Sequence, residues 1–345
     1  MIFDAHSDIW SDITVRNLRG ETDIFRKYHY ERLKKGGIEG SIFVMWIDPP
    51  YTKDPAARLK QIMDAVNKET KNCHDILRIV HNYEEMQKAK DDGIFYVFIG
   101  CEGLSEIGED IGQIDMLYDF GARHASLTWN EQNPLATGIR GDADRGLTGF
   151  GIKALNKIQE LNMLFDVSHL NDKSFWDVMR HAKGAVVATH SSSRKLCPAP
   201  RNLTDEMIKE LVATGGMVGI NSYPEFIAEK KEDRTVDMLA RHIEHIADIA
   251  GIDKIGFGFD FCEFLEGEAS SSCSLEEEEN EQIKSTVSKR ISMDNDESAS
   301  TLRGLRDASE VPALIGALRK MGFTDEDIRK VSYKNWHKVM ETIGK

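Results

Sequence analysis

The feature that most constrains the fold is a regular alternation of short apolar runs with longer amphipathic segments. Runs rich in β-branched and aromatic residues occur eight times, at residues 2–3, 40–47, 94–99, 124–129, 163–167, 185–189, 217–220 and 255–259. Strands that are continuous apolar runs are typical of a parallel sheet that is covered on both faces. The sequence therefore predicts eight buried parallel strands.

The segments between these runs have the apolar spacing of amphipathic helices. Apolar stripes at this spacing occur within residues 55–66, 152–161 and 239–250. Eight strand–helix units fit a (β/α)₈ TIM barrel better than an open doubly wound sheet, which generally has fewer strands. We therefore expect an α/β chain that forms one barrel domain over residues 1–345.

One segment interrupts the alternation. Residues 263–300, after the eighth strand, are rich in serine and glutamate. We predict a long acidic surface insertion there, with a lid over the barrel mouth as the alternative. Two C-terminal helices are predicted to follow, at residues 311–321 and 325–342, and Thr324 with Asp327 has the pattern of a capping box.

Composition excludes several classes of function. The net charge of −14 disfavours nonspecific binding to nucleic acid or to anionic membranes. No run approaches the roughly 20 apolar residues of a membrane span, and no signal peptide is visible. The five cysteines are an odd number without a CxxC pair, which predicts reduced thiols and a cytoplasmic protein. Neither nucleotide-binding glycine motif is present.

Polar residues follow the apolar runs closely at several strand ends. In a barrel, the carboxyl ends of the strands meet on the face where active sites lie. Any one of these residues could simply anchor a loop. Together, however, they are all of residue types that bind metals, and they are more numerous than a single ion requires. The set comprises His6, Asp8, Glu102, His169, His190 and Asp260.

Several motifs around these residues resemble the membrane dipeptidase (renal dipeptidase) family of binuclear zinc hydrolases, which have amidohydrolase-type barrels. They keep the family's order and span nearly the whole chain outside residues 263–300. The motifs are Asp4-Ala5-His6-Ser7-Asp8, Gly100-Cys101-Glu102-Gly103, Leu127-Thr128-Trp129-Asn130, Asp166-Val167-Ser168-His169, Thr189-His190-Ser191-Ser192, Arg201-Asn202 and Gly256-Phe257-Gly258-Phe259-Asp260.

The resemblance implies a role for each predicted ligand. His6 and Asp8 would hold one zinc ion, and His169 and His190 the other. Glu102 would bridge the two ions, and Asp260 would contact a bridging hydroxide and shuttle its proton. Two ions that share a water lower its pKa and polarise the scissile carbonyl. The expected function is therefore hydrolysis of small dipeptides, with Glu102 and Asp260 as catalytic residues.

The resemblance also implies three substrate-binding residues, Arg201, Trp129 and Asn130. Arg201 would read the free carboxylate of the substrate through its guanidinium fork. On spacing alone, a surface arginine that pairs with Asp205 is an equal alternative. Trp129 stands where better-known members carry a histidine, and it could instead line the pocket as an apolar wall.

Two other functions remain open at this stage. One is a related binuclear amidohydrolase that acts on an N-acyl amino acid or a lactam, and Trp129 motivates it. The other is a non-catalytic, metal-loaded binding protein, although such a protein would not need Asp260 as a proton shuttle. We expect no nucleic-acid or membrane partner, and a homodimer is left open.

Two further patterns imitate functional sites. His242 and His245 lie three residues apart on a predicted outer helix, where packing or hydrogen bonding is the favoured interpretation. The serines at residues 191–193 follow His190, but no Gly-x-Ser-x-Gly motif accompanies them. We therefore expect these serines to shape a loop.

Overall fold

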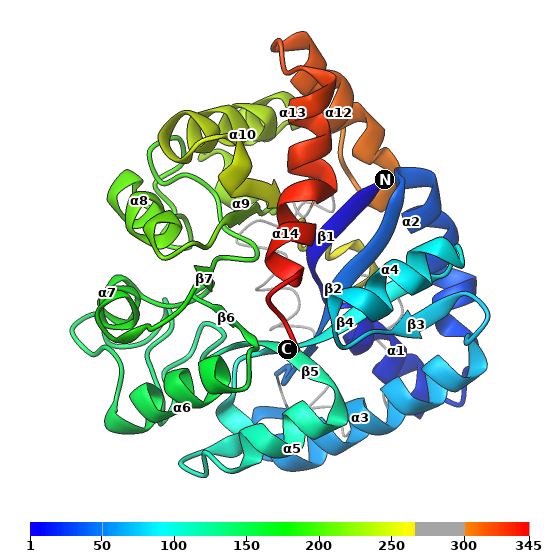
Figure 1. The fold of residues 1–345 in the computed structure, drawn as a ribbon, viewed down its shortest axis with the longest axis vertical. Helices are drawn as coiled ribbons and strands as arrows, with labels where there is room; N and C mark the ends of the chain where they lie inside the picture. Colours follow the sequence, from blue (N-terminus) through cyan, green and yellow to red (C-terminus); the bar gives the residue numbers. More distant parts are fainter. Residues whose placement is uncertain (50, 266–300, 345) are drawn as a thin grey trace.

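The structure is a computed structural model that describes residues 1–49, 51–265 and 301–344 (Figure 1). Eight strands, all paired in parallel, make a nearly closed barrel in the hydrogen-bonded order β7-β6-β5-β4-β2-β1-β9-β8. A parallel bridge between Ala188 and Val218 joins the two ends of this order. The strands are β1 (Ile2–Ser7), β2 (Ile38–Trp46), β4 (Phe95–Glu102), β5 (Ala122–Ser126), β6 (Leu164–Asp166), β7 (Val186–Val187), β8 (Val218–Ile220) and β9 (Ile255–Phe257). The predicted (β/α)₈ fold is confirmed.

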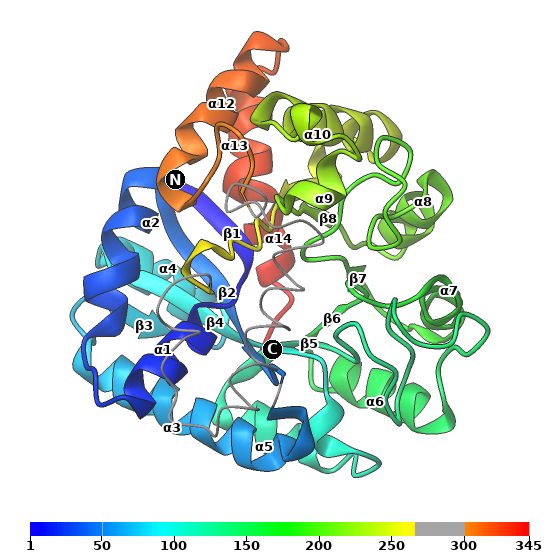
Figure 2. The same cartoon turned by 180° about the vertical axis from the view of Figure 1, so that it is seen from behind.

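Helices surround the barrel in both views (Figures 1 and 2). The three predicted stripes lie on α3, α6 and α10, except that Leu161 follows the end of α6, and each stripe has side chains that are fully buried. The helices are α1 (Ile9–Leu18), α2 (Tyr30–Gly36), α3 (Pro55–Asn72), α4 (Tyr83–Asp91), α5 (Gln113–Phe120), α6 (Gly149–Glu160), α7 (Asp172–His181), α8 (Asp205–Ala213), α9 (Pro224–Ile227), α10 (Val236–Ala250), α12 (Val311–Lys320), α13 (Asp325–Arg329) and α14 (Asn335–Met340). None of the described helices combines the length and the apolar character needed to cross a membrane.

Three details differ from the expectation or lie beyond it. A ninth strand, β3 (Leu77–Ile79), pairs only with β4 and was not predicted, because Arg78 interrupts its apolar run. The predicted final helix is α13 and α14 joined by a π-helical turn (Lys330–Lys334), and its capping box is present. Of the predicted insertion, only a short 3₁₀ turn (Glu263–Leu265) is described, and the rest lies outside the described residues.

Apolar side chains fill the end of the barrel where the strands begin. Phe3 on β1 packs on the ring of Trp336 from α14, with 6.3 Å between ring centroids. The Trp336 indole donates a hydrogen bond to the Phe257 carbonyl at 2.9 Å. A Cβ on Gly256 would lie 2.3 Å from that indole nitrogen, so glycine leaves the space for the ring. This end is closed, and the polar residues lie at the opposite end.

Candidate metal centre

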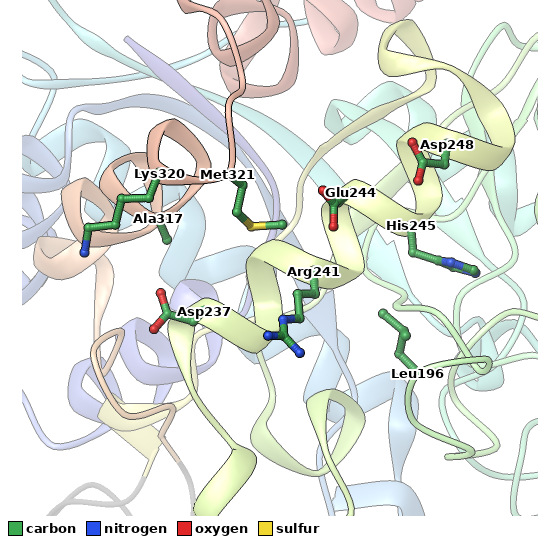
Figure 3. Close-up of a pocket in the computed structure, with 9 residues that line it drawn as sticks. All are labelled: Leu196, Asp237, Arg241, Glu244, His245, Asp248, Ala317, Lys320 and Met321. Atoms are coloured by element: carbon green, nitrogen blue, oxygen red, sulfur yellow. The ribbon is translucent and has the colours of Figure 1, made fainter.

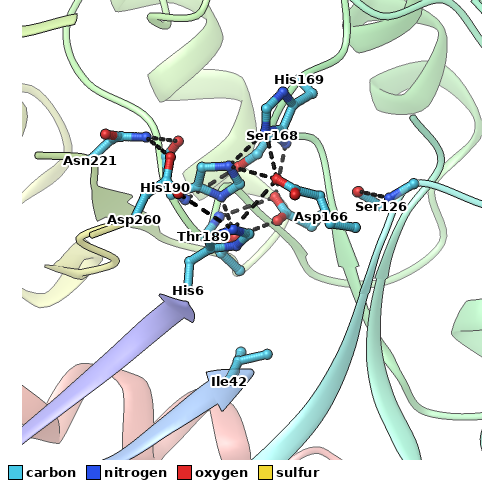
Figure 4. A network of polar contacts seen from close by, with 12 residues as sticks. His6, Ile42, Ser126, Asp166, Ser168, His169, Thr189, His190, Asn221 and Asp260 are labelled. Carbon is cyan, nitrogen blue, oxygen red and sulfur yellow. Dashed lines mark hydrogen bonds and ion pairs between the residues drawn. The ribbon is translucent and has the colours of Figure 1, made fainter. Parts of the chain in front are cut away.

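All six predicted strand-end residues lie together at the carboxyl ends of the strands. Figure 4 labels His6, His169, His190 and Asp260 among them. His6 is in β1, Asp8 is the N-cap of α1, and Glu102 ends β4. His169, His190 and Asp260 follow β6, β7 and β9. Every one is buried, with at most 8% of its surface exposed. Such a concentration of buried ionisable groups requires a partner that offsets their desolvation.

Glu102 lies at the centre of three imidazoles, one from β1 and two from the segments that follow β6 and β7. Its Oε1 atom is 2.8 Å from the Nε2 atom of His169, and 3.4 Å from the Nε2 atoms of both His190 and His6. The Nε2 atoms of His169 and His190 are 2.9 Å apart. One carboxylate oxygen thus lies within 3.4 Å of three imidazole nitrogens.

A second group of donors shares His6 with the first. Ligand atoms of His6, Asp8 and Asp260 lie within 4.8 Å of one another, as do those of His6, Glu102 and His190. The Nε2 atom of His6 is 3.9 Å from Oδ1 of Asp260. Asp260 was predicted to transfer a proton, and its position would also let it ligate an ion beside His6.

Burial keeps the imidazoles in their neutral, ligating form. It lowers the pKa of His6 to about 3 and that of His169 to about 4, with nearby His190 and Arg201 contributing respectively. Burial acts to raise the pKa of Glu102, but the adjacent His169 and His6 bring it well below its ordinary value. The cluster therefore holds neutral nitrogen donors around an ionised carboxylate at neutral pH.

The hydrogen bonds leave lone pairs pointing at one another. The Nδ1–H group of His169 donates to Oδ1 of Asn130 at 2.8 Å, so its Nε2 atom carries a lone pair. Within the described parts of the chain, neither ring nitrogen of His6 makes a hydrogen bond, nor does Oε2 of Glu102. A bound cation would satisfy these converging, electron-rich atoms.

The donor set fits zinc. Imidazole nitrogens and carboxylate oxygens are ordinary zinc ligands, and tetrahedral bonds of about 2.0–2.1 Å place donor atoms about 3.3 Å apart. The observed separations around Glu102 run from 2.8 to 3.4 Å. The cluster can therefore accept a zinc-sized ion with little rearrangement.

Two of these residues adopt strained backbone conformations. His169 has φ +72° and Asp260 has φ +58°, which is the left-handed region that non-glycine residues rarely adopt. Such strain persists where the surrounding structure enforces it, commonly at functional sites. Here it follows the ends of β6 and β9 and turns both side chains into the cluster.

Arg201 is buried beside the cluster rather than on the surface. Its guanidinium donates to the His190 carbonyl at 3.1 Å and to the Ser191 hydroxyl at 3.4 Å, and only 4% of the residue is exposed. Asp205 instead contacts Nε2 of His245 at 3.0 Å. The alternative of a surface pair between Arg201 and Asp205 is therefore wrong.

Trp129 forms an aromatic wall next to the cluster. Its ring lies 5.2 Å from that of Trp46 and 6.2 Å from that of His169, measured between centroids. The amide oxygen of the neighbouring Asn130 is engaged with His169. Asn130 therefore supports His169, a proposed metal ligand. Its predicted contact with substrate stays a prediction.

The structure adds three residues to the cluster, Asn221, Asp166 and Thr189, for which the sequence indicated no role. Asn221, directly after β8, donates from Nδ2 to Oδ2 of Asp260 at 3.1 Å and accepts from the Tyr223 amide at 2.6 Å. Asp166 and Thr189 lie beneath His190 (Figure 4). The available signal was position, since Asn221 follows an apolar run and the other two lie inside the quoted motifs.

The histidine pair that imitates a metal site has a structural role. His242 accepts from the Ser193 amide and donates to the Ile227 carbonyl, so both of its nitrogens are occupied. His245 lines a groove of about 700 Å³ between α10 and α12 (Figure 3). No residue that lines this groove belongs to the predicted ligand set. The interpretation of both histidines as packing or hydrogen-bonding residues is confirmed.

Comparison with known sequences identifies related proteins. The model of the family described as membrane dipeptidase (peptidase family M19) matches residues 1–276. A Klebsiella pneumoniae protein described as uncharacterized, from the pqqA 5′ region, is 28% identical over 276 residues, which cover 77% of this chain and 89% of that one. An uncharacterized dipeptidase of Schizosaccharomyces pombe is 34% identical over 177 residues, which cover 50% of this chain and 42% of that one.

Solved structures share the fold over nearly the whole chain. A metallo peptidase from Rhodobacter sphaeroides, liganded with a phosphinate mimic of the dipeptide L-Ala-D-Ala, has a TM-score of 0.81 at 22% identity, covering 99% of each chain. An amidohydrolase from Pseudomonas aeruginosa has a TM-score of 0.78 at 24% identity, covering 100% of this chain and 97% of that one. At these identities the likeness shows the fold alone.

Proposed function

Because this chain belongs to the membrane dipeptidase family, peptidase family M19, we propose that it is a metal-dependent dipeptidase formed by one barrel domain. It hydrolyses the single peptide bond of small dipeptides. The observation that carries this proposal is the buried cluster in which Oε1 of Glu102 faces the Nε2 atoms of three histidines. The metallo peptidase of the same fold that is liganded with a phosphinate mimic of L-Ala-D-Ala adds support.

The proposed centre takes two zinc ions. His6 and Asp8 would hold one ion and His169 and His190 the other, and Glu102, whose Oε1 atom faces both His169 and His190, would contribute to both sites. When bound, such a pair supplies a water of lowered pKa and polarises the scissile carbonyl. The protein contributes neutral imidazoles and a carboxylate that offsets part of the metal charge.

Asp260 and Arg201 are the two side chains proposed to transfer a proton and to bind the substrate. Asn221 donates to Oδ2 of Asp260 at 3.1 Å, and Oδ1 of Asp260 lies 3.9 Å from Nε2 of His6. From there Asp260 takes a proton from the attacking water and passes it to the leaving amine. Arg201 binds the free carboxylate of the substrate, and the Trp46–Trp129 wall limits the space for its side chains.

The function is tested with a panel of dipeptides, N-acyl amino acids and lactams, assayed with added zinc and after chelation. We expect turnover of dipeptides, loss of that turnover on chelation and its return with zinc. Turnover confined to N-acyl amino acids or lactams would instead establish the related amidohydrolase, which the Trp129 wall favours as second candidate. Tight metal binding without turnover of any compound would identify a binding protein.

Glu102→Gln should weaken the binding of both ions, because Glu102 is the proposed bridge. His190→Ala should mainly empty one site. Metal content of the purified variants, measured after dialysis against a chelator, distinguishes these outcomes. Glu69→Gln is the matched control, since Glu69 is a fully buried carboxylate on α3 that accepts from the Phe25 amide. Two tightly held ions in Glu102→Gln would contradict the bridging role.

A further inference from the structure

A buried carboxylate lies beneath the metal centre without being one of its proposed ligands. Asp166 ends β6 and is fully buried. Its Oδ1 atom accepts the backbone amides of Ser168 at 2.8 Å and Thr189 at 3.1 Å. Its Oδ2 atom accepts from Nε2 of His124 at 3.0 Å and from the Thr189 hydroxyl (Figure 4). Four donors thus converge on a group that the proposed reaction does not use.

The Thr189 hydroxyl connects this carboxylate to His190. Its Oγ1 atom is 2.9 Å from Nδ1 of His190. A hydroxyl has a single proton, and a carboxylate can only accept, so the Thr189 proton is directed to Asp166. Toward His190, Thr189 can then only accept a hydrogen bond. His190 must therefore carry its proton on Nδ1, which leaves a lone pair on Nε2.

That lone pair faces the proposed metal site. The Nε2 atom of His190 is 2.9 Å from Nε2 of His169 and 3.4 Å from Oε1 of Glu102. The opposite tautomer would place an N–H group on the ligating atom. The tautomer of a ligating histidine is commonly set by the hydrogen bond of its other nitrogen.

We propose that Asp166, acting through Thr189, is a positioning residue that fixes the Nδ1-protonated form and the orientation of His190. This relay, Asp166–Thr189–His190, rests on the proposed function, because it builds a donor for the metal centre. His169 is held differently, by the neutral amide of Asn130. The relay should therefore affect the binding of the ion at His169 and His190, and it should not affect the binding of the ion at His6 and Asp8.

The packing around His124 holds the Asp166 carboxylate in place. His124 on β5 holds the second oxygen of Asp166 and is 1% exposed. A Cβ on Gly100 would lie 2.6 Å from Nδ1 of His124, so the glycine leaves room for the ring. The carboxylate is thus held from both sides, and its orientation toward Thr189 is fixed.

The test compares Thr189→Val, which removes the hydroxyl at nearly constant shape, with Thr189→Ser, which keeps it. Zinc affinity is measured by competition with a chelator of known affinity. We expect Thr189→Val to weaken one of the two ions by about 10–100-fold, as is typical for such supporting residues, and Thr189→Ser to stay near the parent. Thr14→Val is the control, because Thr14 is also buried and donates only to the Trp10 carbonyl.

A second readout is the tautomer of His190 in the metal-free protein, observed by ¹⁵N–¹H NMR. The parent should show a proton on Nδ1, and Thr189→Val a mixture of tautomers. Asp166→Asn should favour the opposite tautomer, because its amide can donate to Thr189 and turn the hydroxyl toward His190. This second variant also keeps the test decisive if Thr189→Val folds poorly.

The proposal is overturned if Thr189→Val binds both ions like the parent and leaves the tautomer unchanged. It is equally overturned if Thr189→Ser loses metal as Thr189→Val does, since a purely structural defect would then explain both. Failure of the proposed function is a separate result, seen as a parent protein that binds zinc without hydrolysing dipeptides. The tautomer measurement does not depend on turnover.

Discussion

Asp260→Asn should lower kcat by about 10²–10⁴-fold while the protein keeps both metal ions. The amide has nearly the same shape as the carboxylate and can still accept from Asn221, so the position of the side chain should be kept. It cannot take a proton from water, and the step that protonates the leaving amine loses its donor. The measurement is kcat for a dipeptide, together with metal content for each preparation.

The structure makes the metal analysis essential for this variant. Oδ1 of Asp260 lies 3.9 Å from Nε2 of His6, close enough for a ligand role. Loss of one ion in Asp260→Asn would assign Asp260 to ligation, and near-full turnover would remove it from the mechanism. Asp12→Asn serves as control, because this buried aspartate contacts Arg16 and His29 and should affect stability rather than kcat.

Arg201→Met should lower kcat/KM for free dipeptides by about 10²-fold or more and should abolish the preference for a free carboxyl terminus. The guanidinium is buried, and removing one member of a buried charge pair costs about 3–5 kcal/mol, so Arg201→Met would deprive the bound substrate carboxylate of this contact. Dipeptides with an amidated terminus should therefore be poor substrates for the parent enzyme. Four kcat/KM values, for two enzymes and two substrates, give the coupling directly.

Two further variants separate recognition from support in this prediction. Arg201 also donates to the His190 carbonyl, so metal content must be checked in Arg201→Met. Arg201→Lys keeps the charge but loses the planar fork and should recover only part of the preference. Arg194→Met is the control for disturbance of the loop itself, since Arg194 donates to Asp172 and to the carbonyls of Pro200 and Asn202 on either side of Arg201. A variant at Arg201 that still prefers the free acid as strongly would show that another group reads the carboxylate.

The sequence predicted the barrel because the relevant signals are local and repeated. Each strand of the barrel contains an apolar run, and the predicted apolar stripes follow the helices α3, α6 and α10. Only β3 was missed among the described strands, since Arg78 lies in the middle of its apolar run. Similarly, the strand-end positions of His6, Glu102 and Asp260 could be predicted, because in a barrel all strands end on one face.

The sequence by itself thus determined the fold class and which residue types gather at the barrel mouth. Only the tertiary structure decided which atoms meet there. Glu102 reaches His169 and His190, 67 and 88 positions away in the numbering (169 − 102 and 190 − 102), because β4, β6 and β7 curve around one axis. Likewise, Arg201 contacts the His190 carbonyl rather than Asp205 because the loop between His190 and Arg201 folds back toward the end of β7. Periodicity is a property of neighbouring residues, whereas ligand geometry depends on side-chain directions that barrel closure sets.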